Sequence, residues 1–272
     1  MITSFKLFES NLEIESICKG LGIKNFQIVD GLVDVRGDVN LSNKGLKKLP
    51  IKFGDVSGYF YCHINELTSL EGAPRTVGGD FYCHNNQLTS LEGGPEGVGG
   101  GFYCDNNQLT SLEGSPRNVG GDFYCYDNKL TSLEGAPEGV GGDFYCSNNQ
   151  LTSLVGGPRT VGRGFCCYNN QLTSLEGAPE SVSGGFYCYN NQLTKFTGIP
   201  EYSLNENRDF NCDGNPIYEI YHLFRTPKCI DLINEYEVIG DGVISMVRLE
   251  EVFLELGMGV PRNLRFKEWE LV

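Results

Sequence analysis

Cysteine recurs every 21 residues along most of this chain, and this file of thiols is the first feature that could do chemistry. The file consists of Cys62, Cys83, Cys104, Cys125, Cys146, Cys167 and Cys188. Neighbouring strands lie ~4.8 Å apart, within disulfide range, but thiols that point the same way from parallel strands need strained geometry to bond. A straight file also does not converge on a tetrahedral zinc site. Because cysteine is among the residue types most often buried, we expect these thiols to pack in a core.

Two histidines and a carboxylate form a second candidate, because His63, His84 and Asp105 follow one another at the same interval. On successive coils of a repeat, these side chains would lie ~5 Å apart, and two histidines with a carboxylate can bind a divalent metal. They lie in a line, however, and no neighbouring residue suggests the hydrogen-bonded support that metal ligands need. We therefore predict neither a metal site nor a cofactor.

Tyrosines beside the cysteines are candidates for a binding surface, since tyrosine offers a large, rigid contact area at low entropy cost. One column consists of Tyr61, Tyr82, Tyr103, Tyr124, Tyr145 and Tyr187. A second, variable column consists of His63, His84, Asp105, Tyr126, Ser147, Tyr168 and Tyr189, and a third includes Asp80, Asp122 and Asp143. A ladder of tyrosines would also stiffen a sheet, so a structural role remains open beside the binding role.

The predicted binding residues are therefore taken from the first two columns: Tyr82, Tyr103, Tyr124, Tyr126, Tyr145, Tyr168, Tyr187, Tyr189, His63, His84 and Asp105. Cys166 takes the place of a tyrosine in the first column, at a position expected to be exposed. It is therefore predicted to be a surface thiol.

The elements that would position these columns are the coils of a repeat. In one repeat, Phe81 and Cys83 alternate with exposed positions, which is the spacing of a strand with one buried face; Asn86, Leu88 and Leu91 follow. No coil of this size can bury its apolar face alone, so neighbouring coils must share one core. The rest of each repeat, for example EGGPEGVGG, contains too many glycines and prolines for a helix and predicts an extended or turn-like outer side.

The repeated pattern F-x-C-x-x-N-x-L-x-x-L resembles the leucine-rich-repeat core L-x-L-x-x-N-x-L-x-x-L, and NNQLTSL is similar to the short repeats of bacterial effectors. The near-identical coils also resemble repeat proteins of bacteriophages and environmental microbes. The resemblance implies an α+β repeat fold, a solenoid with a parallel β-sheet on its concave face and a non-helical convex side. One departure is that the valine and the phenylalanine of each repeat stand four residues apart, where the family usually has three, with Gly-Gly in the gap.

Three segments are expected. Residues 38–215 form a solenoid of about nine coils, and residues 1–37 form a cap with a helix through Leu12, Ile17 and Leu21 and a hairpin around Asp30 and Gly31. Residues 216–272 lack the repeat and read as a cap of short helices. Such caps cover the open core and sheet edges at the ends of a solenoid.

The residue after each proline alternates in charge, as Arg75, Glu96, Arg117, Glu138, Arg159 and Glu180. On stacked coils this alternation predicts a ladder of opposite charges, which is worth only ~0–1 kcal/mol per exposed pair but penalises a shift of register. A second column carries one sign, as Glu71, Glu92, Glu113, Glu134 and Glu176, and is expected to be solvated.

The net charge of −14 argues against nucleic acids and anionic membranes as partners, because both are negatively charged. No apolar run approaches the ~20 residues of a membrane helix, and the first residues, MITSFKLFES, show no secretory signal. We read the 11 cysteines as free thiols of a reducing compartment, which predicts a cytoplasmic protein, either in the producing cell or in a host.

The segment KCID, Lys228 to Asp231, resembles the C-x-D signature of bacterial effector ubiquitin ligases, in which the cysteine is the nucleophile and the aspartate supports it. The match is short, and only 43 residues follow Cys229, whereas the catalytic domain of that family is far larger. Cys229 and Ile230 also suit the apolar side of a capping helix.

The main hypothesis is a non-enzymatic scaffold, a monomer or weak homo-oligomer, that binds a partner protein on its concave face. The partner could be a host immune or regulatory protein if the source is a phage or a bacterium. The alternatives are a ubiquitin ligase with Cys229 as nucleophile, and a protein that sequesters a nucleotide or another small ligand with its tyrosines. The acidic charge argues against the nucleotide.

Overall fold

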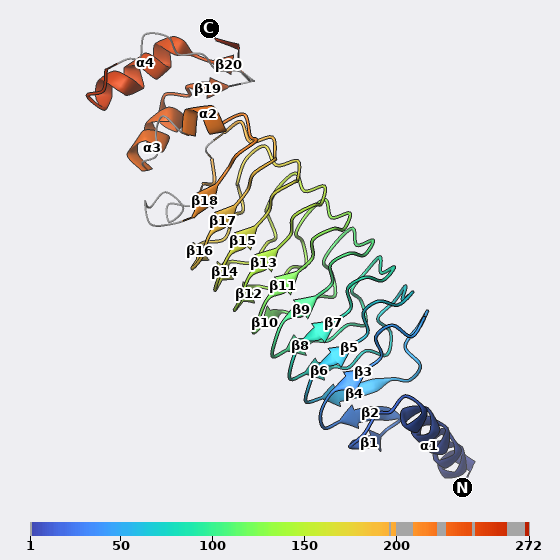
Figure 1. Cartoon of the computed structure of the whole chain (residues 1–272). Helices are drawn as coiled ribbons and strands as arrows, with labels where there is room; N and C mark the ends of the chain where they lie inside the picture. The colour runs from blue at the N-terminus through green and yellow to red at the C-terminus, as the bar shows by residue number, and fades with distance from the viewer. Residues whose placement is uncertain are drawn as a thin grey trace.

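The protein is an elongated stack of coils with a helix at its N-terminal end and several helices at its C-terminal end (Figure 1). The computed structural model describes residues 2–195, 197–199, 209–221, 227–240, 243–259 and 270–271. Two nine-stranded sheets run along the stack, because most coils contribute one short strand to each sheet. The repeat solenoid expected from the sequence is therefore confirmed.

The first sheet, here called the tyrosine sheet, carries the phenylalanine and tyrosine columns. Its strands pair in parallel and in register, so that Phe102 lies beside Phe123 and Tyr103 beside Tyr124. The strands are β3 (Val39–Asn40), β5 (Phe60–Tyr61), β7 (Phe81–Tyr82), β9 (Phe102–Tyr103), β11 (Phe123–Tyr124), β13 (Phe144–Tyr145), β15 (Phe165–Cys166), β17 (Phe186–Tyr187) and β18 (Phe210–Asn211).

The second sheet, here called the valine sheet, was not anticipated, because the sequence predicts only one strand per coil and an extended or turn-like outer side. Because the repeat length is constant, each extended stretch lies at strand spacing beside the equivalent stretch of the next coil, and the two can form hydrogen bonds. For example, the N–H of Gly99 donates to the carbonyl of Val77 at 2.9 Å. The strands are β1 (Phe26–Val29), β2 (Leu32–Val35), β4 (Phe53–Val56), β6 (Thr76–Val77), β8 (Gly97–Val98), β10 (Asn118–Val119), β12 (Gly139–Val140), β14 (Thr160–Val161) and β16 (Ser181–Val182).

The core between the two sheets is continuous along the stack. Successive phenylalanine rings are nearly parallel; the centroids of Phe81 and Phe102 are 5.3 Å apart and those of Phe102 and Phe123 are 5.4 Å apart. Leu109 and Leu112 are fully buried beside them, as are the leucines of the neighbouring coils. Each coil thus buries apolar area that it could not bury alone, which makes the stack cooperative.

A file of asparagines forms hydrogen bonds with the backbone groups at the end of each strand of the tyrosine sheet. Nδ2 of Asn107 donates to the carbonyl of Cys104 in its own coil and to that of Cys83 in the preceding coil, both at 3.1 Å. Its Oδ1 accepts the backbone N–H of Leu88 at 3.0 Å. The same contacts recur from Asn65 to Asn215, so this column links each coil to the one before it.

The ends of the stack carry the expected elements. The helix α1 (Ile2–Gly20) precedes an antiparallel hairpin of β1 and β2, which adds to the edge of the valine sheet. At the other end lie α2 (Tyr218–Tyr221), α3 (Pro227–Glu235) and α4 (Met246–Glu255), with a small sheet of β19 (Ile239–Gly240), β20 (Val243–Ile244) and β21 (Glu270–Leu271). Two longer stretches of the C-terminal part, residues 200–208 and 260–269, fall outside the described residues. None of the helices described here has the length and apolar character needed to span a membrane.

Candidate binding face

The cysteines of the thiol file pack in the core. All seven cysteines from Cys62 to Cys188 that recur every 21 residues are fully buried, and the described cysteines are free. Burial raises the pKa of the Cys104 thiol, so this group stays protonated and unreactive at neutral pH. Among the residues that the structure describes, no group of three or more histidine, cysteine or acidic side chains is arranged to hold a metal ion.

Cys166 is not a surface thiol, contrary to the expectation from its column. Its residue is 3% exposed, because its strand lies between those of Tyr145 and Tyr187, whose rings are much larger than a thiol. The phenol of Tyr145 lies beside its sulfur, and burial raises the pKa of the Cys166 thiol to about 12. A small residue in a column of rings is covered by its neighbours.

The first tyrosine column forms a ladder on the outer surface of the tyrosine sheet. The ring centroids of Tyr82 and Tyr103 are 4.6 Å apart with an interplanar angle of 5°, and those of Tyr124 and Tyr145 are 4.7 Å apart. Tyr103 and Tyr124 meet edge to face, at 88°, which divides the ladder into two stacks. All of these rings are half-buried, so the ladder supports the sheet and also presents ring edges to solvent.

The third column is a structural element rather than a row of free carboxylates. Oδ1 of Asp80 accepts the N–H of Gly101 in the next coil at 2.7 Å, and its Oδ2 accepts the phenol of Tyr82 at 2.6 Å. Asp122 accepts the N–H of Asp143 at 2.8 Å, and Asp143 likewise accepts a backbone N–H of the coil that follows. The column therefore bonds each coil to the next one, and Asp80 also fixes the phenol of Tyr82.

The N-terminal half of the variable column is a stacked histidine pair. The rings of His63 and His84 lie 4.5 Å apart at 10°, and Nδ1 of His63 is buried without a hydrogen-bond partner among the described residues. Burial and the neighbouring His84 lower the pKa of His63; burial also lowers the pKa of His84, against the charge of Asp105.

Asp105 was expected on an exposed surface beside the histidines, and its residue is only 4% exposed. Nδ2 of Asn106 donates to its carboxylate at 3.0 Å, and the phenol of Tyr126 lies beside it. These neighbours cover the carboxylate, and burial with the charge of Asp105 raises the pKa of Tyr126 to about 12. Asp105 is thus covered by its neighbours instead of facing a ligand.

The C-terminal half of the variable column is aromatic and more open. Ser147 is 1% exposed, but Tyr168 and Tyr189 are half-buried and stack at 4.4 Å and 6°. Beside them the side-chain amides of Asn148, Asn169 and Asn190 form a row, in which Nδ2 of Asn169 donates to Oδ1 of Asn148 and Nδ2 of Asn190 donates to Oδ1 of Asn169. This half of the column contributes Tyr168 and Tyr189 to the predicted binding residues.

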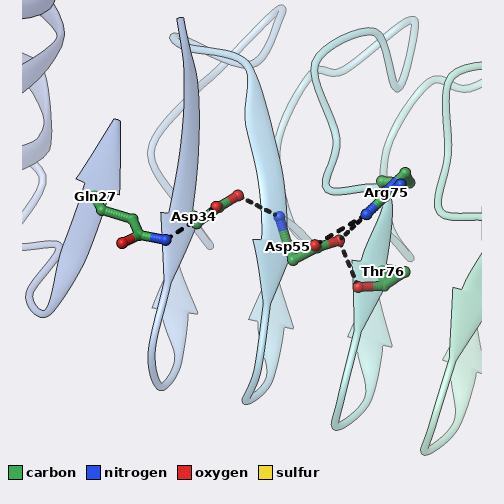
Figure 2. A network of polar contacts seen from close by, with 5 residues as sticks. All are labelled: Gln27, Asp34, Asp55, Arg75 and Thr76. Carbon is green, nitrogen blue, oxygen red and sulfur yellow. Dashed lines mark hydrogen bonds and ion pairs between the residues drawn. The ribbon is translucent and has the colours of Figure 1, made fainter. Parts of the chain in front are cut away.

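A polar network at the N-terminal end of the valine sheet is not among the sites predicted from the sequence. Figure 2 shows the carboxylate of Asp34 accepting Nε2 of Gln27 at 3.3 Å and the N–H of Asp55 at 2.9 Å. Asp55 in turn accepts the hydroxyl of Thr76 at 2.7 Å and the guanidinium of Arg75 at 3.1 Å, and these bonds lower its pKa. The signal was the 21-residue interval between Asp34 and Asp55, which places their side chains in line.

This network lines an open groove of about 790 Å³ over β1, β2, β4 and β6. Both carboxylates of the network already have protein partners, so the groove offers a ligand few free acceptors. We interpret the network as the joint that fixes the N-terminal hairpin to the first coils.

No protein-family model matches the chain, and no curated protein matches it. Among solved structures it is similar to YopM from Yersinia enterocolitica WA-314, with 20% sequence identity and a TM-score of 0.36 over 65% of this chain. The match spans 47% of the YopM chain.

The decisive observations are internal to the chain: coils of 21 residues, an in-register parallel sheet and an asparagine file that bonds each coil to the one before it. The fold is a leucine-rich-repeat solenoid. In this solenoid the phenylalanine and cysteine columns occupy the first two apolar positions of the repeat, and the Gly-Gly steps bring neighbouring coils into close backbone contact.

The charged columns of the solenoid form separate pairs instead of a continuous ladder. Arg117 bonds Glu138 at 2.7 Å and Arg159 bonds Glu180 at 2.9 Å, whereas Arg75 bonds Asp55 of the preceding coil. Each of these side chains is largely exposed, so the pairs add little stability.

The cysteine of the KCID segment lies in α3 of the solenoid's C-terminal end, but its side chain is outside the described part of the structure. Ile230 is buried, as the capping interpretation expects, and Asp231 is exposed.

Proposed function

We propose that this protein is a non-enzymatic scaffold that binds a partner protein through the outer surface of the tyrosine sheet. The observation that carries the proposal is the aromatic surface formed by the first and variable columns on a rigid backbone. The phenols of Tyr82 and Tyr187 are hydrogen-bonded to aspartates, and a surface of pre-positioned tyrosines loses little entropy when it binds.

The variation along the surface supports recognition. The core columns hardly change from coil to coil, whereas the column that follows the cysteines changes from histidine to aspartate, serine and tyrosine. A purely structural face would not need this variety, and it gives each section of the surface its own shape and polarity.

We further propose that the protein acts in a reducing cytoplasm, in the producing cell or in a host, and blocks a regulatory or immune protein by occupying its surface. The support for this setting is the resemblance to bacterial and phage repeat proteins together with the free, buried thiols.

The test is site-specific photo-crosslinking in the natural host cell. A benzophenone amino acid at position 168 should capture one protein, and the same group at position 160, on the valine sheet, should not. Tyr126→Ala with Tyr168→Ala should abolish capture at a neighbouring position such as 189, while Thr160→Ala should leave it intact. Equal capture from both faces, or capture that survives the double tyrosine variant, would reject the tyrosine sheet as the binding face.

The two alternatives have direct tests. A ligase would transfer ubiquitin in a reaction that Cys229→Ala abolishes. A nucleotide-sequestering protein would bind a labelled nucleotide in equilibrium dialysis, with loss of binding in Tyr126→Ala.

A further inference from the structure

The two halves of the variable column differ in what they leave open to a partner. Toward the N-terminus, His63 and His84 stack and Asp105 is buried. Toward the C-terminus, the stacked rings of Tyr168 and Tyr189 are followed in the same column by Asp213, which is exposed.

The position of Asp213 is fixed by the coil stacking. The N–H of Asn190 donates to the carbonyl of Asp213 at 2.7 Å, and the N–H of Asp213 donates to Oδ1 of Asn211 at 2.9 Å. The backbone of Asp213 therefore lies one coil beyond that of Tyr189, ~4.8 Å along the stack, so both side chains belong to the same column.

The charge of this face has one sign. Four columns point outward on this face. Counted from each core phenylalanine, or from Val39 in the first coil, they are the residues one before, one after, three after and four after it. These columns contain aspartates but no lysine or arginine. The aspartates are Asp38, Asp80, Asp105, Asp122, Asp127, Asp143, Asp209 and Asp213. Of these, Asp127, Asp209 and Asp213 are exposed on the C-terminal half of the stack. Such a face attracts cations and repels acidic partners.

We propose that the section formed by Tyr168, Tyr189 and Asp213, here called the C-terminal patch, binds an arginine-bearing segment of the partner protein. The inference rests on the proposed function and specifies the partner's chemistry. A guanidinium stacks on a tyrosine ring and pairs with a carboxylate through two parallel N–H groups, and the patch offers both partners on adjacent coils. The exposed amides of Asn169 and Asn190 lie beside it and can accept further hydrogen bonds.

Arginine fits the patch better than lysine. The lysine ammonium is strongly hydrated and cannot match a planar ring and a carboxylate at once, whereas a guanidinium can do so at a smaller desolvation cost. A purely electrostatic surface would not distinguish the two, so the difference between them is the signature of this site.

The experiment measures binding of fluorescein-labelled nona-arginine and nona-lysine peptides to the full chain by fluorescence anisotropy at several salt concentrations. Nona-arginine should bind more tightly than nona-lysine, and Tyr168→Ala with Tyr189→Ala should weaken it by about tenfold, since each exposed cation–π contact is worth ~0.5–1 kcal/mol. Tyr168→Phe with Tyr189→Phe keeps both rings and should retain binding.

The matched control removes the same charge from another face. Asp213→Asn should weaken nona-arginine binding by about threefold, and Glu134→Gln, in the acidic column outside the tyrosine sheet, should change it by less than ~1.5-fold. Equal losses from the two variants, or equal affinity for both peptides, would show nonspecific attraction to an acidic protein and overturn the proposal. Thermal melting of each variant checks that it is folded.

The failure of this inference can be told apart from failure of the proposed function. If the partner still crosslinks to position 168 but nona-arginine does not compete with it, the tyrosine sheet is the binding face and the arginine assignment is wrong. If crosslinking shows no preference for this face, the proposed function itself fails.

Discussion

At the scale of single residues, left-handed backbone positions show how strictly the coils are built. The residue before each asparagine of the asparagine file has a positive φ; Asn85 and Asn106 both have φ of 53°. Asparagine tolerates this conformation, whereas a β-branched residue does not. In the first full coil the position holds Ile64, also at φ of 53° and 50% exposed.

Ile64→Asn should therefore stabilise the protein. Relief of the left-handed strain predicts a gain of about 1 kcal/mol in the free energy of unfolding, measured by urea denaturation. The control is Val155→Asn, because Val155 is equally exposed but does not have a positive φ. If both substitutions have the same effect, removal of exposed apolar surface and not backbone strain is the cause.

The first glycine of each Gly-Gly step allows the coils to approach one another. A Cβ at Gly120 would collide with the carbonyl oxygen of Gly99 in the preceding coil, whereas a Cβ at Gly97 would meet nothing within 4 Å. Gly120→Ala should lower the free energy of unfolding by about 1–3 kcal/mol, as expected of an overpacked site.

Gly97→Ala is the matched control and should be neutral or slightly stabilising, by up to ~1 kcal/mol, because it restricts the unfolded chain. Ser57 and Ser183 occupy the corresponding position at the two ends of the series, and glycine fills it in all the coils between them. Thermal melts in which the two alanine variants behave alike would argue against the close contact.

At the scale of elements, the histidine stack makes the tyrosine sheet sensitive to pH. His63 and His84 both have pKa values below 6.5, chiefly because they are buried, and Tyr61, Tyr82 and Asp105 surround them. The unfolded chain therefore binds protons more readily than the folded one. The contribution of the pair to stability is complete above pH 6.5 and is lost as the pH falls from there toward the folded pKa values.

The expected result is a larger loss of unfolding free energy between pH 7.5 and pH 5 in the natural protein than in the His63→Asn, His84→Asn variant. Comparing the two chains cancels the carboxylate titrations that they share. A pH dependence that is identical in both would mean that the stacked rings titrate as they do in water.

At the scale of the whole molecule, the charge of −14 opposes folding because it concentrates repulsion in a compact body. The exposed column that includes Glu113 and Glu134 places like charges on successive coils. Raising sodium chloride from 20 to 300 mM should increase the free energy of unfolding by about 1 kcal/mol, since the Debye length falls from ~20 to ~6 Å.

The matched variant, Glu113→Gln with Glu134→Gln, should be more stable than the natural chain at low salt and gain less from added salt. Urea unfolding at both salt concentrations measures this. An unchanged salt response in the variant would place the repulsion elsewhere on the surface.

Much of this architecture can be derived from the sequence, because a strict interval states which residues are equivalent. Phe102, Cys104 and Asn107 recur with their coils, so burial of one column member implies burial of the others. The helix and hairpin of the N-terminus and the helices of the C-terminus also follow from local signals, namely apolar spacing and the Asp30-Gly31 turn. Where the same contacts repeat from coil to coil, the residue types and their spacing are enough to predict which side chains are buried.

Where the sequence failed, neighbours in space decided the outcome. Cys166 and Asp105 occupy columns expected to be exposed, and both are buried because neighbouring side chains, among them rings on adjacent coils, cover them. The valine sheet and the Asp34–Asp55 network likewise exist only once the coils are stacked. Periodicity fixes which way a side chain points, but its exposure also depends on the size and polarity of residues one coil away, and these vary along an otherwise uniform stack.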